Sequence, residues 1–231
     1  MPNRNSTNTH TTQLPLHWDD YSTVMLDMDG TLLDLHFDNH FWQHDVPLRY
    51  SEKHGMPLAV AHQRLKALTR AVEGELQWYC IDYWSEKLDL DIALLKEEVE
   101  HLIQIHPHVI PFLEQLQQLN KPAWLVTNAH QRSLQLKMQR TRLAGYFSEI
   151  ISTHSLGIPK EKPDFWRVLA AQHPFNPATT LFIDDSLPVL RSAQSYGFHG
   201  LIAINRPDSQ GPEKAQSEFT AVNNFSPLLT L

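Results

Sequence analysis

The sequence predicts an α/β fold in which a parallel sheet flanked by helices carries an all-helical insertion after its first strand. Short apolar runs end at polar clusters, and helical patterns separate these runs. Apolar runs without alternation are typical of strands buried on both faces, and strands that alternate with helices indicate right-handed βαβ units. Residues 36–108 break this rhythm because they contain helical patterns and no convincing strand.

Five apolar runs are expected to form the strands of the sheet. They cover residues 22–26, 123–126, 149–152, 180–183 and 200–204. Apolar residues at helical spacing predict a helix at 109–119 and others around Leu134, Phe165 and residues 187–196. Within the insertion, helices are expected at residues 37–50, 58–72, 76–88 and 92–105.

These patterns divide the chain into a tail, a core and an insertion. Residues 1–17 are polar and are expected to form a flexible tail. Residues 18–35 and 109–231 are expected to form the α/β core, and residues 36–108 the helical insertion.

Composition excludes several classes of protein. The 231 residues include 19 Lys and Arg against 26 Asp and Glu, and 42% are hydrophobic. A hydrophobic content this high argues against disorder, and a net charge of −7 argues against nucleic-acid or anionic-membrane partners. Cys80 is the single cysteine, the start of the chain lacks the apolar stretch of a signal peptide, and no apolar run could span a membrane. We therefore expect a cytoplasmic protein, as a monomer or small homo-oligomer.

Polar residues directly follow three of the expected strands. Parallel strands bring their carboxyl ends to one edge of the sheet, where ligands bind. The side chains expected to converge there are Asp27, Asp29, Thr127, Asn128, Asp184 and Asp185.

Four carboxylates in one crevice repel each other strongly, and a divalent cation relieves that repulsion. Oxygen ligands without His or Cys favour Mg²⁺, which also binds phosphate oxygens. Gly30 allows a tight turn that would point backbone N–H groups inward as an anion nest. On their own, Thr127 could belong to a turn and Asp184 or Asp185 could cap the next helix.

Together these motifs resemble the haloacid dehalogenase (HAD) superfamily. Residues 27–32 (DMDGTL) look like its DxDGT motif, 125–128 (LVTN) its second motif and 182–186 (FIDDS) its acidic fourth motif. The third motif is a lysine before a helix, for which Lys160 and Lys162 are the candidates. Pro163 and Trp166 lie three and six residues after Lys160, which favours Lys160, although the intervening Glu161 and Lys162 depart from the usual pattern.

The resemblance implies a Rossmann-like HAD core and phosphoryl transfer in two steps. Asp27 would attack phosphorus to form an aspartyl-phosphate. Asp29 would protonate the leaving oxygen and then activate the hydrolytic water. The dehalogenase branch lacks a carboxylate at the position of Asp29, so halide displacement is disfavoured.

The same resemblance implies how metal and phosphate would be held. Mg²⁺ would bind the Asp27 carboxylate, the Asp29 backbone carbonyl and Asp185, with Asp184 bound directly or through water. Thr127, the Asn128 backbone and Lys160 would hold the phosphoryl oxygens.

The insertion resembles the family's C1 cap, which closes over the site. Residues 34–43 and 78–84, together with 128–130 and 152–154, look like the bacterial GMP/IMP nucleotidase branch. The implied substrates are therefore nucleoside monophosphates, GMP and IMP. A purine could stack on an aromatic ring and hydrogen-bond a nearby polar group, although core packing is the competing role for the aromatic residues. The candidate substrate contacts are Phe41, Trp42, Asp38 and Trp84.

Two other functions remain open at this point. A phosphatase or phosphomutase acting on a sugar phosphate, or on another small phosphomonoester, would use the same four motifs. A ligand-binding protein without catalytic activity could also have this fold, but every motif position that the chemistry needs is filled.

Overall fold

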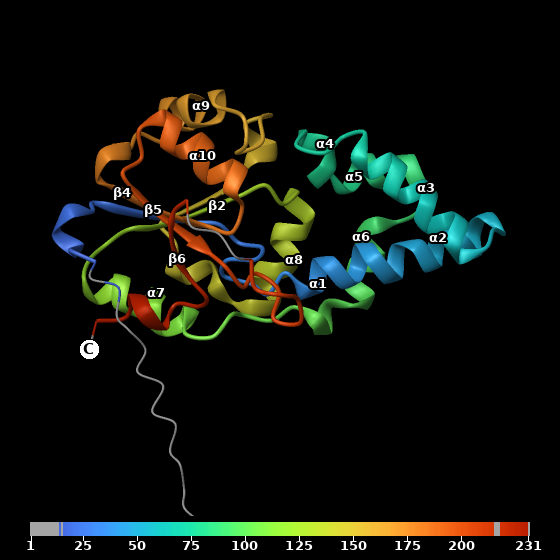
Figure 1. Cartoon of the computed structure of the whole chain (residues 1–231), viewed down its shortest axis with the longest axis horizontal. Helices are drawn as coiled ribbons and strands as arrows, with labels where there is room; N and C mark the ends of the chain where they lie inside the picture. Colours follow the sequence, from blue (N-terminus) through green and yellow to red (C-terminus); the bar gives the residue numbers. More distant parts are fainter. Residues whose placement is uncertain (1–13, 15, 215–217, 231) are drawn as a thin grey trace, which may run out of the picture.

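The computed structural model describes residue 14, residues 16–214 and residues 218–230, and it confirms the predicted α/β class. Its sheet has six parallel strands (Figure 1). In spatial order they are β3 (Glu149–Ser152), β2 (Ala123–Thr127), β1 (Thr23–Leu26), β4 (Thr180–Asp184), β5 (Gly200–Ile204) and β6 (Thr220–Val222). The first five match predicted strands, whereas β6 was not predicted.

Helices cover both faces of the sheet, which explains the continuous apolar strands. Val24 and Leu26 of β1 face the cluster formed with α7 (Val109–Gln118) and α8 (Gln131–Thr141). Met25 faces the cluster formed with α9 (Asp164–Gln172) and α10 (Leu187–Tyr196) on the other side. Alternate residues of one strand are therefore buried on opposite faces.

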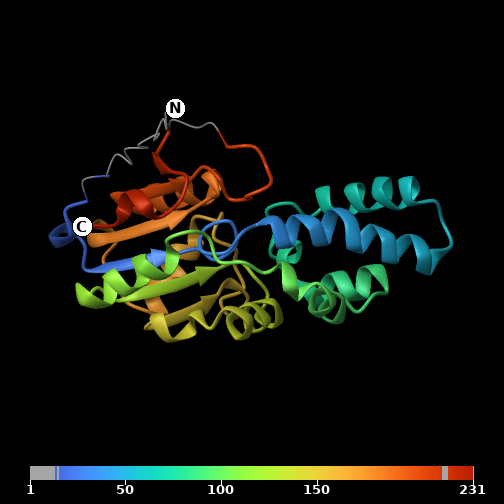
Figure 2. The same cartoon turned by 90° about the horizontal axis from the view of Figure 1, so that it is seen from below.

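The chain between β1 and α7 forms a helical lobe beside the core (Figures 1 and 2). The lobe contains α1 (His36–His40), a π-helical turn (Phe41–Asp45), α2 (Val46–His54), α3 (Leu58–Arg70), α4 (Leu76–Tyr79), α5 (Ile81–Leu88) and α6 (Ile92–Glu98). It has an apolar cluster of its own, built around Phe41, Leu65 and Trp84. We propose that this lobe is the cap.

Two of the predicted cap helices differ from the structure. The helix expected at 76–88 is broken at Cys80, whose backbone is extended and whose Sγ accepts a hydrogen bond from the Tyr83 N–H to cap α5. The helix expected at 92–105 ends at Glu98 and continues only as a short 3₁₀ turn, Glu100–Leu102.

The predicted flexible tail, residues 1–17, was drawn too long at its C-terminal end. Leu14 and Leu16 pack against the main core, and the Leu14 N–H donates to the Pro227 carbonyl at 2.9 Å. Residues 1–13 and 15 of that tail lie outside the described residues. Over the part of the chain that the structure describes, no helix has the length and apolar character needed to cross a bilayer.

Candidate active site

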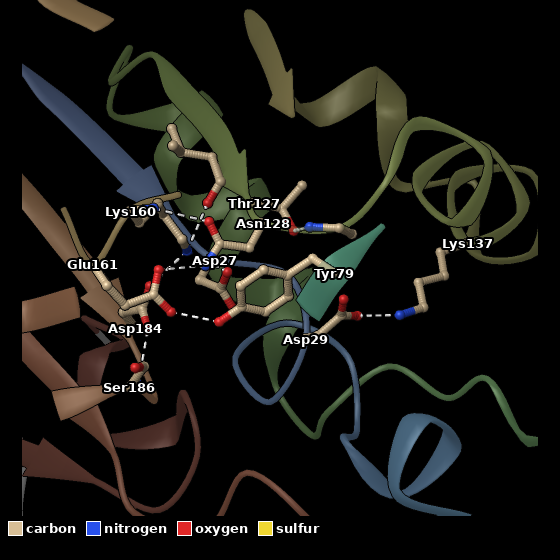
Figure 3. Close-up of polar contacts among 12 residues, drawn as sticks. Asp27, Asp29, Tyr79, Thr127, Asn128, Lys137, Lys160, Glu161, Asp184 and Ser186 are labelled. Carbon is tan, nitrogen blue, oxygen red and sulfur yellow. Dashed lines mark hydrogen bonds and ion pairs between the residues drawn. The ribbon is translucent and has the colours of Figure 1, made fainter. Parts of the chain in front are cut away.

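The carboxyl ends of three adjacent strands bring the predicted polar residues together (Figure 3). Thr127 and Asp184 are the last residues of β2 and β4, and Asp27 directly follows β1, which lies between them. All three side chains are buried. These side chains converge because parallel strands all have their carboxyl ends at the same edge of the sheet.

Lys160 lies at the centre of this group. Its buried Nζ donates to Asp27 Oδ1 at 2.5 Å, Asp184 Oδ2 at 2.7 Å and the Val126 carbonyl at 3.0 Å. Lys162 instead pairs with Glu75 of the lobe at 2.7 Å, and both of those side chains are exposed. The geometry therefore makes Lys160 the lysine of the site.

The side chain of Asn128 positions the segment that carries Lys160. Asn128 Oδ1 accepts a hydrogen bond from the Lys160 backbone N–H at 3.0 Å, and Asn128 Nδ2 donates to Glu161 Oε2 at 2.9 Å. The other oxygen of Glu161 accepts from the hydroxyl of Tyr79, at the end of α4 (Figure 3). Glu161, which departs from the usual motif, thus joins the core to the lobe, a role that sequence reasoning missed.

Asp27, Asp184 and Asp185 form a cluster that suits a hard cation. One carboxylate oxygen from each lies within 4.8 Å of the others. Burial raises the pKa of each of the three to about 6, and repulsion from a neighbouring carboxylate adds to this. Oxygen donors of this kind fit Mg²⁺. Asp184 Oδ1 also accepts a hydrogen bond from the backbone N–H of Ser186 at 2.8 Å, which forms a turn before α10 and not a side-chain cap of that helix.

Asp29 belongs to a second set of charges, in which the two lysines are buried and the two carboxylates partly buried. Lys137 of α8 donates to Asp29 Oδ1 and to Asp38 Oδ2, each at 2.6 Å, and Lys96 of α6 donates to the other oxygen of Asp38 at 2.6 Å. Burial tends to raise the pKa of Asp38, but Lys137 and Lys96 hold it below its usual range. Lys137 and Lys96 therefore hold Asp38 as a charged carboxylate in the cavity wall, and its contact with a purine stays a prediction.

A cavity of about 1140 Å³ lies between this polar floor and the lobe. The lobe contributes aromatic residues to its wall, namely Trp42, Trp78, Tyr79 and Trp84. Trp84 is nearly fully buried, donates to the Trp78 carbonyl at 2.9 Å and packs edge-on against Trp42. Phe41 is fully buried in the cluster inside the lobe, so its predicted substrate contact was wrong.

Residues 21–197 match the haloacid dehalogenase-like hydrolase family. The chain belongs to the haloacid dehalogenase-like hydrolases. The GMP/IMP nucleotidase YrfG of Escherichia coli is 39% identical to this hydrolase over 212 residues, which are 92% of this chain and 96% of the relative.

Solved structures share the fold of this hydrolase. A HAD phosphatase from Thermococcus onnurineus superposes with a TM-score of 0.75 at 23% identity, over 90% of this chain and 95% of its own. Magnesium-bound YfnB from Bacillus subtilis, a HAD hydrolase, superposes with a TM-score of 0.61 at 20% identity, over 90% and 96% of the two chains. The family thus agrees with the fold and with the four motifs.

Gly30 of the hydrolase offers a test of how tightly the site is packed. Its φ is +87°, and a Cβ there would lie 2.8 Å from Asp185 Cγ and 2.9 Å from Pro207 Cβ. Gly30→Ala is expected to destabilise the fold by about 1–3 kcal/mol and to weaken Mg²⁺ binding by displacing Asp185. Gly145→Ala is the control because no atom lies within 4 Å of its Cβ. Urea unfolding and Mg²⁺ titration measure the two effects. An equal loss of unfolding free energy in Gly30→Ala and Gly145→Ala would contradict the close approach of Asp185 and Pro207 to Gly30.

The raised carboxyl pKa values predict a pH-dependent response to Mg²⁺. A carboxyl with a pKa of about 6 in the fold and 3.8 as its ordinary value keeps a proton that the unfolded chain releases. The stability that these three carboxyls contribute to the metal-free fold is therefore lost as pH rises from about 4 through 6. Mg²⁺ displaces those protons, so saturating Mg²⁺ is expected to raise the melting temperature more at about pH 7.5 than at about pH 5. Thermal melts with EDTA or Mg²⁺ check this, and an equal shift at both pH values would contradict it.

Proposed function

We propose that this hydrolase is a Mg²⁺-dependent phosphatase that converts the purine 5′-mononucleotides GMP and IMP to nucleoside and phosphate in the cytoplasm. The observation that carries the proposal is the pair Asp27 and Asp29 on the floor of a cavity whose lobe wall is aromatic. A cavity of about 1140 Å³ has room for a nucleotide. The 39% identity to a protein named GMP/IMP nucleotidase supports the purine substrate.

Asp27 and Asp29 divide the chemistry between them. A carboxylate oxygen of Asp27 attacks phosphorus, and the bond to the 5′-oxygen breaks as Asp29 gives that oxygen its proton. Asp29 then takes a proton from water, whose oxygen attacks the same phosphorus and releases phosphate and the Asp27 carboxylate. Burial raises the pKa of Asp29 to about 6, although Lys137 opposes this, and a value near neutral suits a group that must act as acid and then as base.

The groups around these aspartates would hold the phosphoryl group in line. Thr127 and the Asn128 backbone lie in the cavity wall, and Lys160 would exchange one of its present acceptors for a phosphoryl oxygen. Asp27, the Asp29 carbonyl, Asp184 and Asp185 would hold the metal. Bound Mg²⁺ would neutralise charge that develops on the transferring oxygens.

Trp42 is the proposed purine contact because it lines the cavity and is only partly buried. Trp42→Ala is expected to raise the KM for GMP by roughly tenfold or more, since base stacking on an aromatic ring contributes about 1–3 kcal/mol. The KM for p-nitrophenyl phosphate, which has no purine, should change much less. Steady-state kinetics with both substrates measure the difference, and equal changes in KM would count against stacking.

A substrate panel tests the proposed function directly. Phosphate release is measured with GMP, IMP, AMP, UMP, glucose 6-phosphate and p-nitrophenyl phosphate, with and without Mg²⁺. GMP and IMP should lead by a wide margin, and only when Mg²⁺ is present. If phosphate is released fastest from glucose 6-phosphate, the substrate is a sugar phosphate and the proposed purine substrate is wrong. No release from any ester in Mg²⁺ would overturn the phosphatase itself and favour the phosphomutase or the binding protein.

A further inference from the structure

A second cluster of metal-ligating side chains lies where the lobe meets the core. It consists of Cys80, between α4 and α5, together with His130, at the start of α8, and His154, in the 3₁₀ turn Thr153–Ser155. The sulfur and one nitrogen from each ring lie within 4.8 Å of one another. None of these three residues belongs to the carboxylate cluster of the active site.

His154 points independently to a ligand at this cluster. Its Nε2 is buried and makes no hydrogen bond to any described residue. A buried polar atom without a partner is costly, and most such atoms in folded proteins are satisfied by protein, water or an ion. The ring also makes a hydrogen bond to the Asn128 backbone, which fixes it with Nε2 free. Metal-binding histidines commonly use the second ring nitrogen in this way.

The other two residues are also held in defined orientations. The Arg132 backbone N–H donates to His130 Nδ1 at 3.3 Å, so neutral His130 carries its ring proton on Nε2, beside Asp82. A metal would bind at Nδ1 in place of the Arg132 N–H, with Nε2–H directed at the carboxylate. The Tyr83 N–H donates to Cys80 Sγ at 3.4 Å. The rings of His130 and His154 meet edge to face, with centroids 4.9 Å apart.

The charge state of the cluster suits a cation. Burial lowers the pKa of His154 to about 4, with repulsion from His130 adding to this, and burial also lowers the pKa of His130. Both imidazoles are therefore neutral near pH 7, which is the form that binds metals. The carboxylate of Asp82 lies 3.5 Å from His130 Nε2 and adds a negative charge beside the cluster.

We propose that Cys80, His130 and His154 form a second metal site, specific for Zn²⁺ or a similar divalent transition metal. Sulfur and imidazole donors select such ions over Mg²⁺. In a tetrahedral zinc site the ligand atoms lie roughly 3.3–3.6 Å apart, so atoms that lie within 4.8 Å of one another need to converge by at most about 1.5 Å. Water would complete the coordination.

Metal at this site would fasten the lobe to the core. Cys80 belongs to the lobe and both histidines to the core, and the neighbouring Tyr79 already contacts Glu161 across the same boundary. Where the proposed phosphatase reaction requires the lobe to open for product release, bound Zn²⁺ would slow turnover. The binding site itself stands independently of that reaction.

Cobalt absorption provides the test, because Cys80 is the single cysteine in the sequence. The full chain is stripped with EDTA and titrated with Co²⁺ in excess Mg²⁺, which occupies the oxygen-only site. Thiolate-to-cobalt charge-transfer absorption should rise to one equivalent and disappear when Zn²⁺ displaces Co²⁺. Any such band must arise from Cys80.

Three variants decide which residues bind the metal. Cys80→Ser should abolish the band. His154→Gln should weaken binding by more than about 10–100-fold, the loss typical of residues that only support a metal ligand. The exposed His199→Gln should match wild type. Absence of a saturable band in wild type, or unchanged affinity in His154→Gln, would overturn the site.

Inhibition by Zn²⁺ at saturating Mg²⁺ is a separate measurement. It is made on any phosphate ester that the hydrolase is found to cleave. Wild type should be inhibited over the concentration range in which Co²⁺ is displaced, and Cys80→Ser should not. A cobalt band without inhibition by Zn²⁺ would support the metal site but contradict its effect on lobe opening. If the hydrolase cleaves no phosphate ester at all, the proposed function is contradicted and the metal site is not.

Discussion

Replacing Asp27 by Asn is expected to abolish phosphate release without unfolding the protein. The amide has the shape of the carboxylate but is not a nucleophile, so no aspartyl-phosphate forms. Loss of a covalent nucleophile lowers kcat by at least on the order of 10⁴-fold. The measurement is phosphate release from GMP in Mg²⁺.

The fold should survive this change because two opposing effects accompany it. The substitution weakens the charged hydrogen bond that Lys160 donates to Asp27 Oδ1. It also removes a buried carboxylate whose pKa is raised to about 6 by burial, as expected where the charged form is unfavourable. Circular dichroism and thermal melts should therefore resemble wild type. Asp164→Asn is the control because Asp164 is exposed on α9, and it should retain full activity. An Asp27→Asn protein within about tenfold of wild-type kcat would exclude Asp27 as the nucleophile.

The floor of the site could be predicted from the sequence because strand ends determine it. Once the apolar runs are assigned to parallel strands, Asp27, Thr127 and Asp184 must converge at one edge. Lys160 and Lys162 could not be separated by strand position, since both lie in a loop. Their different burial and partners separate them in the structure.

The residues that join the lobe to the core could not be predicted in the same way. Lys137 lies on an amphipathic helix, and only the packed structure shows that its long side chain reaches Asp29 and Asp38. The π-helical turn Phe41–Asp45 widens the helix and shifts the phase of its faces, so helical spacing cannot say which aromatic residue faces the cavity. Phe41 is consequently buried in the lobe, and its neighbour Trp42 lines the cavity.

Replacing Lys160 by Met should show how much one buried cation stabilises the site. Lys160 lies between two buried carboxylates, at 2.5 Å from Asp27 and 2.7 Å from Asp184. Its removal leaves both without their counter-charge, and loss of one partner from a buried ion pair costs about 3–5 kcal/mol. Lys162→Met is the matched control because Lys162 pairs with Glu75 at an exposed position, where a pair contributes at most about 1 kcal/mol.

Urea unfolding in EDTA and in Mg²⁺ measures how much each substitution lowers the free energy of unfolding. It also separates two explanations for the loss in Lys160→Met. If the loss in Lys160→Met arises from uncompensated negative charge, Mg²⁺ should restore part of the stability, since the cation binds the same carboxylates. Activity should stay low even then, because the lysine that orients Asp27 and would bind the phosphoryl group is gone. If the loss arises from altered packing around a new side chain, Mg²⁺ should add no more stability than it adds to wild type. Equal costs for Lys160→Met and Lys162→Met would contradict the central position given to Lys160, because the two substitutions remove the same charge two residues apart.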